Sequence, residues 1–287
     1  MTTTRQHPYA RYVALGDSQT EGLGDGDEAH GYRGWADRLA EILAAVNPDL
    51  TYANLAVRGR LTAGIKAEQL GPALALKPDL VTVMAGMNDL VRPGFDAARV
   101  AADLEEMFTE LTAAGAHVAT VTFPDIGRIA PLARRALPRV LDLNARIRAA
   151  ADRHGVTVLD TFPHRVTTDP RLWSGDRLHA SPLGHARIAE GMADALGLPG
   201  HEDWLTTLPP LAPVSVLGEV AAEARWLAGF MGPWLWRRMR GRSSGDGREA
   251  KRPALGAVTV PDLPDLPDLP DLPAGPAGSA GSRTGLT

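Results

Sequence analysis

The sequence Tyr-Val-Ala-Leu-Gly-Asp-Ser-Gln-Thr-Glu-Gly, residues 12–22, places a short apolar run directly before a polar turn. The apolar run Tyr12–Leu15 is typical of a buried strand, and the Asp-Ser pair that follows it is typical of a helix start. The same order recurs where Leu80–Met84 is followed by Ala-Gly-Met-Asn-Asp. Because residues just past the ends of parallel strands meet at one edge of a sheet, we expect Ser18 and Asn88 to face the same rim.

Apolar runs and amphipathic segments alternate through the first two hundred residues. The predicted strands are Tyr12–Leu15, Thr51–Leu55, Leu80–Met84, His117–Thr122 and Val156–Leu159. The predicted helices are Trp35–Val46, Ala63–Leu70, Ala97–Ala114, Pro138–His154 and Pro182–Leu196. In the first helix, the helical period places one apolar stripe at Trp35, Leu39, Ile42, Leu43 and Val46. Continuously apolar strands separated by helices indicate a parallel, five-stranded sheet covered on both faces.

Composition limits the classes of function. The chain has 287 residues, of which 44% are hydrophobic, which is ample for a packed core. A formal net charge of −4 argues against nucleic acid as the main partner. The absence of cysteine excludes disulfides, thiolate zinc sites and a cysteine nucleophile. Because the N-terminus shows no apolar core of a secretory signal and no segment has the length of a membrane span, we expect a cytoplasmic protein.

The character of the sequence changes near residue 201. We expect a domain built on this sheet over residues 1–200, a helical extension over 201–240 and a disordered, low-complexity tail over 241–287. Within the extension, Val214–Met239 has the pattern of one helix interrupted by Gly-Pro, with aromatic residues followed by arginines. Such a segment suits either packing on its own domain or weak peripheral contact of residues 214–242 with an anionic membrane.

Asp176 and His179 form the sharpest pair of candidate site residues. Their spacing at a helix start lets the carboxylate hold one ring nitrogen and leaves the other for a serine. Ser18 is the candidate nucleophile, because a serine hydroxyl becomes reactive when a neighbouring base takes its proton. The alternative is structural: Asp17 and Ser18 cap a helix, and Asp176 and His179 are a capping carboxylate and a solvated histidine.

Two further residues suit the binding of an oxyanion. Gly59 follows the second predicted strand, where a backbone N–H without a neighbouring Cβ can approach a developing negative charge. Asn88 can offer its side-chain amide to the same oxyanion. Each also has an ordinary interpretation, as a loop glycine and as an Asx-turn that closes a strand. We expect the adjacent Asp89 to be structural.

Four short motifs, in this order, resemble the sequence blocks of the SGNH (GDSL-type) hydrolases. They are Gly16-Asp17-Ser18, Gly59, Gly86-x-Asn88-Asp89 and Asp176-x-x-His179, and the resemblance covers roughly residues 11–198. It implies a flavodoxin-like, three-layer α/β/α fold and a serine esterase acting on small-molecule esters, with no cofactor and no metal. It also implies Ser18 as nucleophile, His179 as general base and Asp176 as orienting acid. The implied oxyanion donors are the N–H groups of Ser18 and Gly59 and the amide of Asn88.

The sequence departs from this family pattern in two places. Gln19 stands where the family usually has an apolar residue, and Arg58 and Arg60 flank Gly59. The two arginines suit an anionic substrate, or they are simply solvated. The substrate classes left open are carboxylesters, thioesters, lysophospholipids and O-acetyl sugars.

Two other functions compete with the esterase. One is a metal-dependent phosphoesterase, because Gly-x-Asn-Asp loosely resembles the metal-binding loops of dinuclear sites. Such sites need more histidine ligands than His179 alone. A non-catalytic carbohydrate- or partner-binding module on the same fold predicts an inert Ser18.

Overall fold

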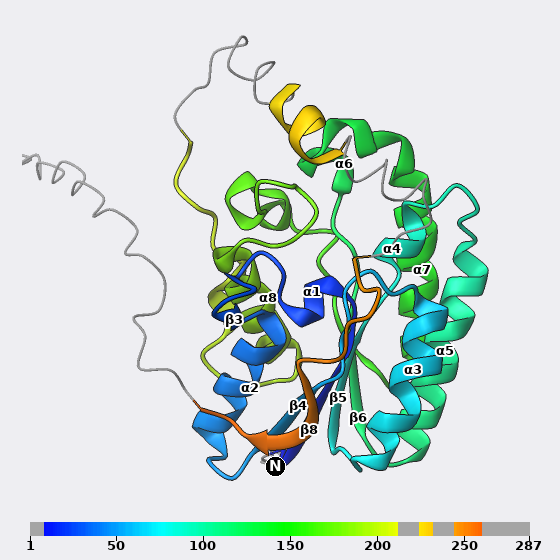
Figure 1. Ribbon diagram of the computed structural model, residues 1–287, viewed down its shortest axis with the longest axis vertical. Coiled ribbons are helices and arrows are strands. Elements are labelled where there is room, and N and C mark those ends of the chain that lie inside the picture. Colours follow the sequence, from blue (N-terminus) through cyan, green and yellow to red (C-terminus); the bar gives the residue numbers. More distant parts are fainter. Residues whose placement is uncertain (1–8, 212–223, 232–243, 260–287) are drawn as a thin grey trace, which may run out of the picture.

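In the computed structural model, which describes residues 9–211, 224–231 and 244–259, the apolar runs form five strands of a six-stranded sheet (Figure 1). Its strands, in sequence order, are β1 (Arg11–Gly16), β4 (Thr51–Asn54), β5 (Leu80–Met84), β6 (His117–Val121), β7 (Thr157–Leu159) and β8 (Arg252–Ala257). In space the order is β7-β6-β5-β1-β4-β8. The first five strands run parallel, and β8 pairs antiparallel with β4. The short strands β2 (Gly26–Asp27) and β3 (Gly31–Tyr32) pair separately.

Helices cover both faces of the sheet and produce three layers (Figure 1). On one face α2 (Trp35–Val46) packs against α8 (Pro182–Ala195); on the other lie α3 (Thr62–Ala75), α5 (Ala97–Ala113) and α7 (Leu137–His154). Short helices follow three strands: α1 (Ser18–Glu21), α4 (Met87–Leu90) and α6 (Ile126–Ile129). The 3-10 helices are η1 (Pro131–Ala136), η2 (Arg165–Thr168), η3 (Pro170–Leu172) and η4 (Glu202–Leu205). The predicted α/β/α fold class is confirmed.

The predicted strands and long helices are all present, and their ends agree within one residue except at the end of α3. Helix α3 does not end at Leu70 but continues through Pro72 to Ala75, because Ala73 is buried and Leu74 packs against the core. Val46 ends α2 and is 59% exposed, so it does not belong to the buried stripe of that helix.

The prediction of five strands and of disorder throughout residues 241–287 is wrong for residues 252–257. These residues form β8, paired so that Thr51 lies opposite Ala257 and Asn54 opposite Arg252. An edge strand needs only one hydrogen-bonded neighbour and leaves much of its surface in water, so it carries no apolar run. Residues 260–287 lie outside the described residues, and their disorder stays a prediction.

The sheet domain also extends past residue 200. The side chain of Trp204, in η4, belongs to the buried core, and its Nε1 donates to Asp194 on α8 at 2.9 Å. Of the predicted helix Val214–Met239, only residues 224–231 are described; they form a helical turn that continues as the π-helical turn η5 (Leu227–Met231). The rest of that segment lies outside the described residues. Within the described ranges, no helix has both the length and the apolar character needed to cross a membrane.

Candidate active site

Ser18 is held at the first position of α1, directly after the central strand. Asp17 caps this helix by accepting the N–H of Gln19 at 3.2 Å. Gly16 leaves room for the turn, because a Cβ there would lie 2.3 Å from the Thr20 hydroxyl and 2.8 Å from the carbonyl of Met84. The turn at the end of β1 therefore fixes the backbone position of Ser18.

His179 lies between Ser18 and Asp176. Its Nε2 is 2.8 Å from Ser18 Oγ, and its Nδ1 is 2.6 Å from Asp176 Oδ2. With the proton on Nδ1 donated to the carboxylate, Nε2 is left to accept the serine proton. The other carboxylate oxygen, Asp176 Oδ1, accepts the Ser174 hydroxyl at 2.6 Å and the N–H groups of Leu178 and His179 at 2.9 Å. The three candidate residues predicted from the sequence are thus brought together.

The Asp176 carboxyl is ionised at neutral pH. Burial by itself would raise its pKa, but the hydrogen bond and the charge of His179 outweigh burial and lower the pKa to about 2. A fixed negative charge at Nδ1 favours the imidazolium that forms when His179 takes a proton.

Asn88 lies at the start of α4 and joins two loops. Its Nδ2 donates to Asp17 Oδ2 at 2.9 Å and to the carbonyl of Arg60 at 3.1 Å. The second bond places the loop of Gly59 beside Asn88, and Gly59 has φ +76°, in the left-handed region that favours glycine. The sequence therefore predicted the neighbourhood of Gly59 and Asn88, although the Asn88 amide here is directed at protein acceptors.

Two carboxyl groups, buried Asp17 and partly buried Asp89, support these loops. Burial raises the pKa of Asp17 to about 6, partly opposed by its hydrogen bond from the Gln19 N–H. Asp89 is structural, as predicted: its Oδ2 accepts both the N–H and the hydroxyl of Thr62 at the start of α3, at 3.0 and 2.9 Å.

The two arginines in the loop after β4 are both paired with carboxylates. The backbone N–H of Arg58 donates to Glu21 at 2.7 Å, and its guanidinium contacts Glu21 and also Glu28 at 2.7 Å. The Arg58 and Glu21 side chains are only 7% and 9% exposed. Arg60 pairs with Glu68 at 2.8 Å. Because their charges are balanced within the chain, the arginines brace the loop, and the anionic-substrate interpretation loses its support.

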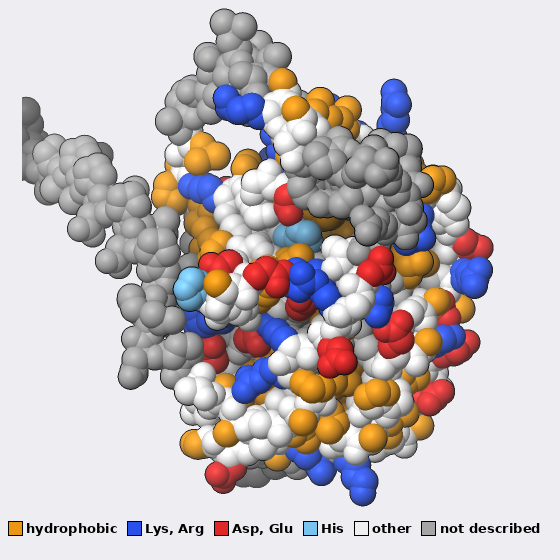
Figure 2. Space-filling model, in the orientation of Figure 1, with side chains coloured by type: hydrophobic (Ala, Val, Ile, Leu, Met, Phe, Trp, Pro, Cys, Tyr) orange, Lys and Arg blue, Asp and Glu red, His pale blue; other side chains and the backbone are white. Residues whose placement is uncertain are grey.

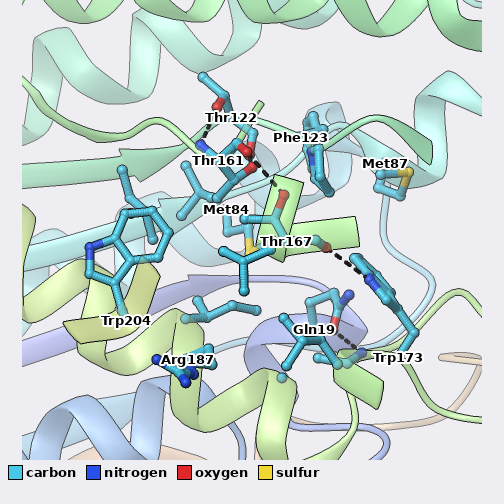
Figure 3. A pocket seen from close by; sticks show the side chains of 18 residues that line it. Gln19, Met84, Met87, Thr122, Phe123, Thr161, Thr167, Trp173, Arg187 and Trp204 are labelled. Atoms are coloured by element: carbon cyan, nitrogen blue, oxygen red, sulfur yellow. Dashed lines mark hydrogen bonds between the residues drawn. The ribbon is translucent and has the colours of Figure 1, made fainter. Parts of the chain in front are cut away.

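An apolar cavity of about 60 Å³ lies beside these loops (Figure 3). Gln19, Met87 and Ala180 line it, and each is the sequence neighbour of a candidate site residue. Other side chains around it in Figure 3 include Met84, Phe123, Trp173 and Trp204. Within the described residues, no three or more histidine, aspartate or glutamate side chains converge as a metal-binding group.

The chain matches the GDSL-like lipase/acylhydrolase family over residues 14–187, which is more than half of its length. The chain belongs to this family. Membership in the GDSL-like family indicates the hydrolysis of esters as its general activity.

One relative by sequence and two solved structures are similar to this GDSL-like hydrolase. An arylesterase of Vibrio mimicus is 26% identical over 187 residues, which are 65% of this chain and 88% of that protein. The crystal structure of TesA is 26% identical with a TM-score of 0.53, covering 65% of this chain and 97% of that one. The acetylxylan esterase Axe2 of Geobacillus stearothermophilus has a TM-score of 0.54 at 21% identity, covering 69% and 97%. About a third of this GDSL-like chain lies outside each match.

Sequence reasoning missed the role of Gln19 in this GDSL-like site. Gln19 Nε2 donates to the carbonyl of Leu178 and its Oε1 accepts the N–H of Ala180, both at 3.1 Å. One amide thus holds the peptide groups on both sides of His179. The available signal was a polar residue directly after Ser18, where the family usually has an apolar one.

The C-terminal extension also reaches the site. Trp226 Nε1 donates to the backbone carbonyl of Asp176 at 2.8 Å, and the Arg177 guanidinium lies 5.0 Å from the centre of the Trp226 ring. Trp226 is buried by this contact. Its position in the sequence, fifty residues beyond Asp176, gave no sign of the pairing.

Proposed function

We propose that the chain cleaves carboxylic esters through the triad Ser18, His179 and Asp176 and an acyl-enzyme intermediate. The observation that carries the proposal is the 2.8 Å contact of His179 Nε2 with Ser18 Oγ, made by residues 161 positions apart while Nδ1 is held by Asp176. A capping serine and a solvated loop histidine have no need of such a contact. A base oriented in this way takes the serine proton as Oγ attacks the ester carbonyl.

The remaining steps follow from the neighbours of Ser18. The carbonyl oxygen becomes an oxyanion, which the N–H groups of Ser18 and Gly59 and the Asn88 amide bind. For Asn88 this requires release of one of its bonds, to Asp17 or to the Arg60 carbonyl. His179 then gives its proton to the leaving alcohol, while the acyl group stays on Ser18 Oγ. Water, deprotonated by the same histidine, attacks the acyl-enzyme and releases the acid.

We infer that the acyl group is short and occupies the apolar cavity lined by Gln19, Met87 and Ala180. The cavity has little free space, about 60 Å³, and its lining is mostly apolar, with Arg187 the one charged side chain in it, which suits a small, uncharged acyl group. Among p-nitrophenyl esters, kcat/KM is expected to be highest for acetyl to butyryl and to fall by about tenfold or more for octanoyl. An equal or higher value for octanoyl places the acyl chain elsewhere.

Covalent labelling tests the mechanism directly. A fluorophosphonate probe is expected to modify Ser18, located by peptide mass spectrometry, and to abolish ester hydrolysis in proportion to labelling. A screen of a carboxylester, a thioester, a lysophospholipid and an O-acetyl sugar then identifies the substrate class. An unlabelled Ser18 supports the non-catalytic binding module, and label on another residue contradicts the triad.

Chelation separates the esterase from a metal-dependent phosphoesterase. With Ser18 as nucleophile, the rate of ester hydrolysis is expected to be unchanged after EDTA treatment and gel filtration. Loss of activity that a divalent cation restores contradicts the serine mechanism.

We also propose that residues 214–242 either pack on the chain's own domain or make weak peripheral contact with an anionic membrane. Binding to lipid vesicles distinguishes the two alternatives. Trp226 packs on the Asp176 loop, which supports the intramolecular alternative for that residue, whereas Leu227 is 39% exposed. The full chain is expected not to pellet with vesicles of anionic phospholipid. Pelleting with anionic but not with zwitterionic vesicles supports peripheral membrane contact instead.

A further inference from the structure

Residues 244–259, which we call the C-terminal strap, lie beyond the family match yet return to the candidate active site (Figure 1). We propose that the strap is a working part of the active site, in which Lys251 and Arg248 are positioning residues. They hold helix α1 and the loop of Gly59 in fixed positions relative to each other. The inference rests on the proposed function, because Ser18 begins α1 and Gly59 is a proposed oxyanion donor.

Lys251 connects helix α1, which carries Ser18, to Tyr32 and to helix α2. Its ammonium donates to the carbonyl of Glu21, the last residue of α1, at 2.5 Å, and to the carbonyl of Tyr32 at 2.9 Å. A third bond of 2.6 Å goes to the carboxylate of Asp37, at the start of α2. All three donors of the ammonium are thus used, and each acceptor belongs to a different element. A four-residue helix such as α1 has little internal support, so this external contact helps to hold its C-terminal end in place.

Arg248 acts on the loop through a chain of alternating charges. Its guanidinium lies 2.8 Å from Glu28, and Glu28 in turn lies 2.7 Å from Arg58. Arg58 is the residue directly before Gly59, and it is paired with Glu21 of α1 in a buried ion pair. Through this single network of ion pairs, the strap is connected to both the loop of Gly59 and helix α1. In Figure 2, basic and acidic side chains are intermingled in the middle of the face of the molecule that is shown.

The strap also lies against the backbone of the loop itself. A Cβ added to Gly245 would lie 2.0 Å from the carbonyl oxygen of Arg58, so only glycine allows this approach. At its other end the strap is fixed by β8, where Arg252 pairs with Asn54, the last residue of β4. The loop that carries Gly59 is therefore held between its own strand and the strap.

The expected consequence is a loss of transition-state stabilisation without a loss of substrate binding. Oxyanion donors act only at about 2.7–3.1 Å from the developing charge. A displacement of about 1 Å costs on the order of a hundredfold in rate. Since Ser18 and Gly59 lie on the two elements that the strap connects, loosening the strap changes the distance between attacking oxygen and oxyanion donor.

Full-length variants test this. In Lys251→Met and Gly245→Ala, kcat per titrated active site is expected to fall by about 10- to 100-fold, with KM changed by less than about twofold. The matched control is Lys66→Met: Lys66 is a similarly exposed lysine that pairs with Asp103 and Glu106, between α3 and α5. Its kcat is expected to stay within twofold of the original chain. Arg248→Gln is expected to give a smaller loss than Lys251→Met.

Hydrogen exchange provides a readout that does not depend on activity. The amides of residues 19–22 and 57–60 are expected to exchange at least fivefold faster in Lys251→Met and Gly245→Ala, and at the original rate in Lys66→Met. Unchanged exchange in both strap variants overturns the inference, as does an unchanged kcat per active site in a chain that hydrolyses esters. If the original chain hydrolyses no ester, the proposed function fails, and the exchange rates still decide whether the strap holds these loops.

Discussion

Strands β1 and β8 belong to one sheet but are specified in different ways. β1 lies between β4 and β5, and five of its six residues are buried, so nearly every position must be apolar. β8 pairs with β4 alone, and none of its six residues is fully buried. Its sequence, Arg-Pro-Ala-Leu-Gly-Ala, contains a proline and a glycine, which sheets tolerate mainly at an edge. An interior strand is thus specified by its own residues, and an edge strand by the neighbour that accepts it.

The candidate site shows the same difference. Ser18 and Asn88 follow interior strands, and their places could be expected from the apolar runs before them. The contacts of Gln19 with the His179 loop, and of Lys251 with α1, join segments far apart in the sequence. Variants of the residues that follow interior strands, and of the residues that make long-range contacts, measure how far activity depends on each group.

The largest effect is expected from the residues that follow β1 and precede α8. Ser18→Ala and His179→Ala are each expected to lower kcat for a short p-nitrophenyl ester by roughly three or more orders of magnitude. The double variant is expected to lose no more than either single variant, because the residues act as one unit. A double variant that loses the product of the two single effects contradicts their assignment to one mechanism.

A smaller loss is expected from the strand that neighbours β1. Asn88→Ala is expected to lower kcat by about two to three orders of magnitude with little change in KM, since its amide serves the transition state. Steady-state kinetics on the same ester measure it. Because Asn88 also bonds to Asp17 and Arg60, thermal unfolding of the variant is the control. An unchanged kcat with lowered stability leaves Asn88 a purely structural role.

Gln19 tests the long-range side of the comparison. Gln19→Leu removes both hydrogen bonds to the peptide groups around His179. At about 1 kcal/mol for each bond, kcat is expected to fall by about 10- to 30-fold. Gln19→Glu keeps the acceptor for the Ala180 N–H but loses the donor to the Leu178 carbonyl, so an intermediate loss is expected. Activity of Gln19→Leu equal to that of the original chain shows that backbone and packing alone place His179.

The smallest effect concerns stability and comes from His185 on α8. Its Nδ1 accepts the N–H of Trp35 at 3.0 Å, its Nε2 donates to the carbonyl of Leu23 at 3.0 Å, and burial lowers its pKa to about 3. A folded-state pKa below the unfolded value of about 6.5 means that the unfolded chain binds more protons between these values. The stability contributed by neutral His185 is present above pH 6.5 and is lost as pH falls toward 3.

His185→Gln isolates this contribution, because a glutamine amide can offer both an acceptor and a donor there. The difference in unfolding free energy between the original chain and the variant is expected to grow with pH, by at most about 1.4 kcal/mol per unit between pH 4 and 6. Asp17 acts in the opposite direction, since its raised pKa of about 6 makes stability fall as pH rises through the same range. Both proteins share that effect, so it cancels. Urea unfolding at several pH values measures the difference, and a pH-independent difference contradicts a buried neutral histidine.

Much of the fold and the site could be predicted because the responsible signals are local. Each apolar run became a parallel strand, and the three-residue spacing of Asp176 and His179 already predicted their pairing. β8 and the roles of Trp226 and Lys251 could not be predicted, because each depends on a contact with a distant segment that leaves no periodicity or motif. Gln19 was marked only as a polar residue at a usually apolar position, and its two partners were not. The position of Asn88 was predictable, whereas its bond to Asp17 was not, since the two residues follow different strands and only the assembled sheet brings them together.

The pairing of β8 with β4 also bears on how the protein behaves in concentrated solution. Without β8, the outer N–H and C=O groups of Thr51–Asn54 would form an open sheet edge, which is a template for pairing with another molecule. β8 replaces that edge with one that is a poor template, because Pro253 has no N–H and Arg252 carries a charge. Removing the residues after 243 is therefore expected to promote self-association of the remaining chain, and light scattering at increasing protein concentration would reveal it.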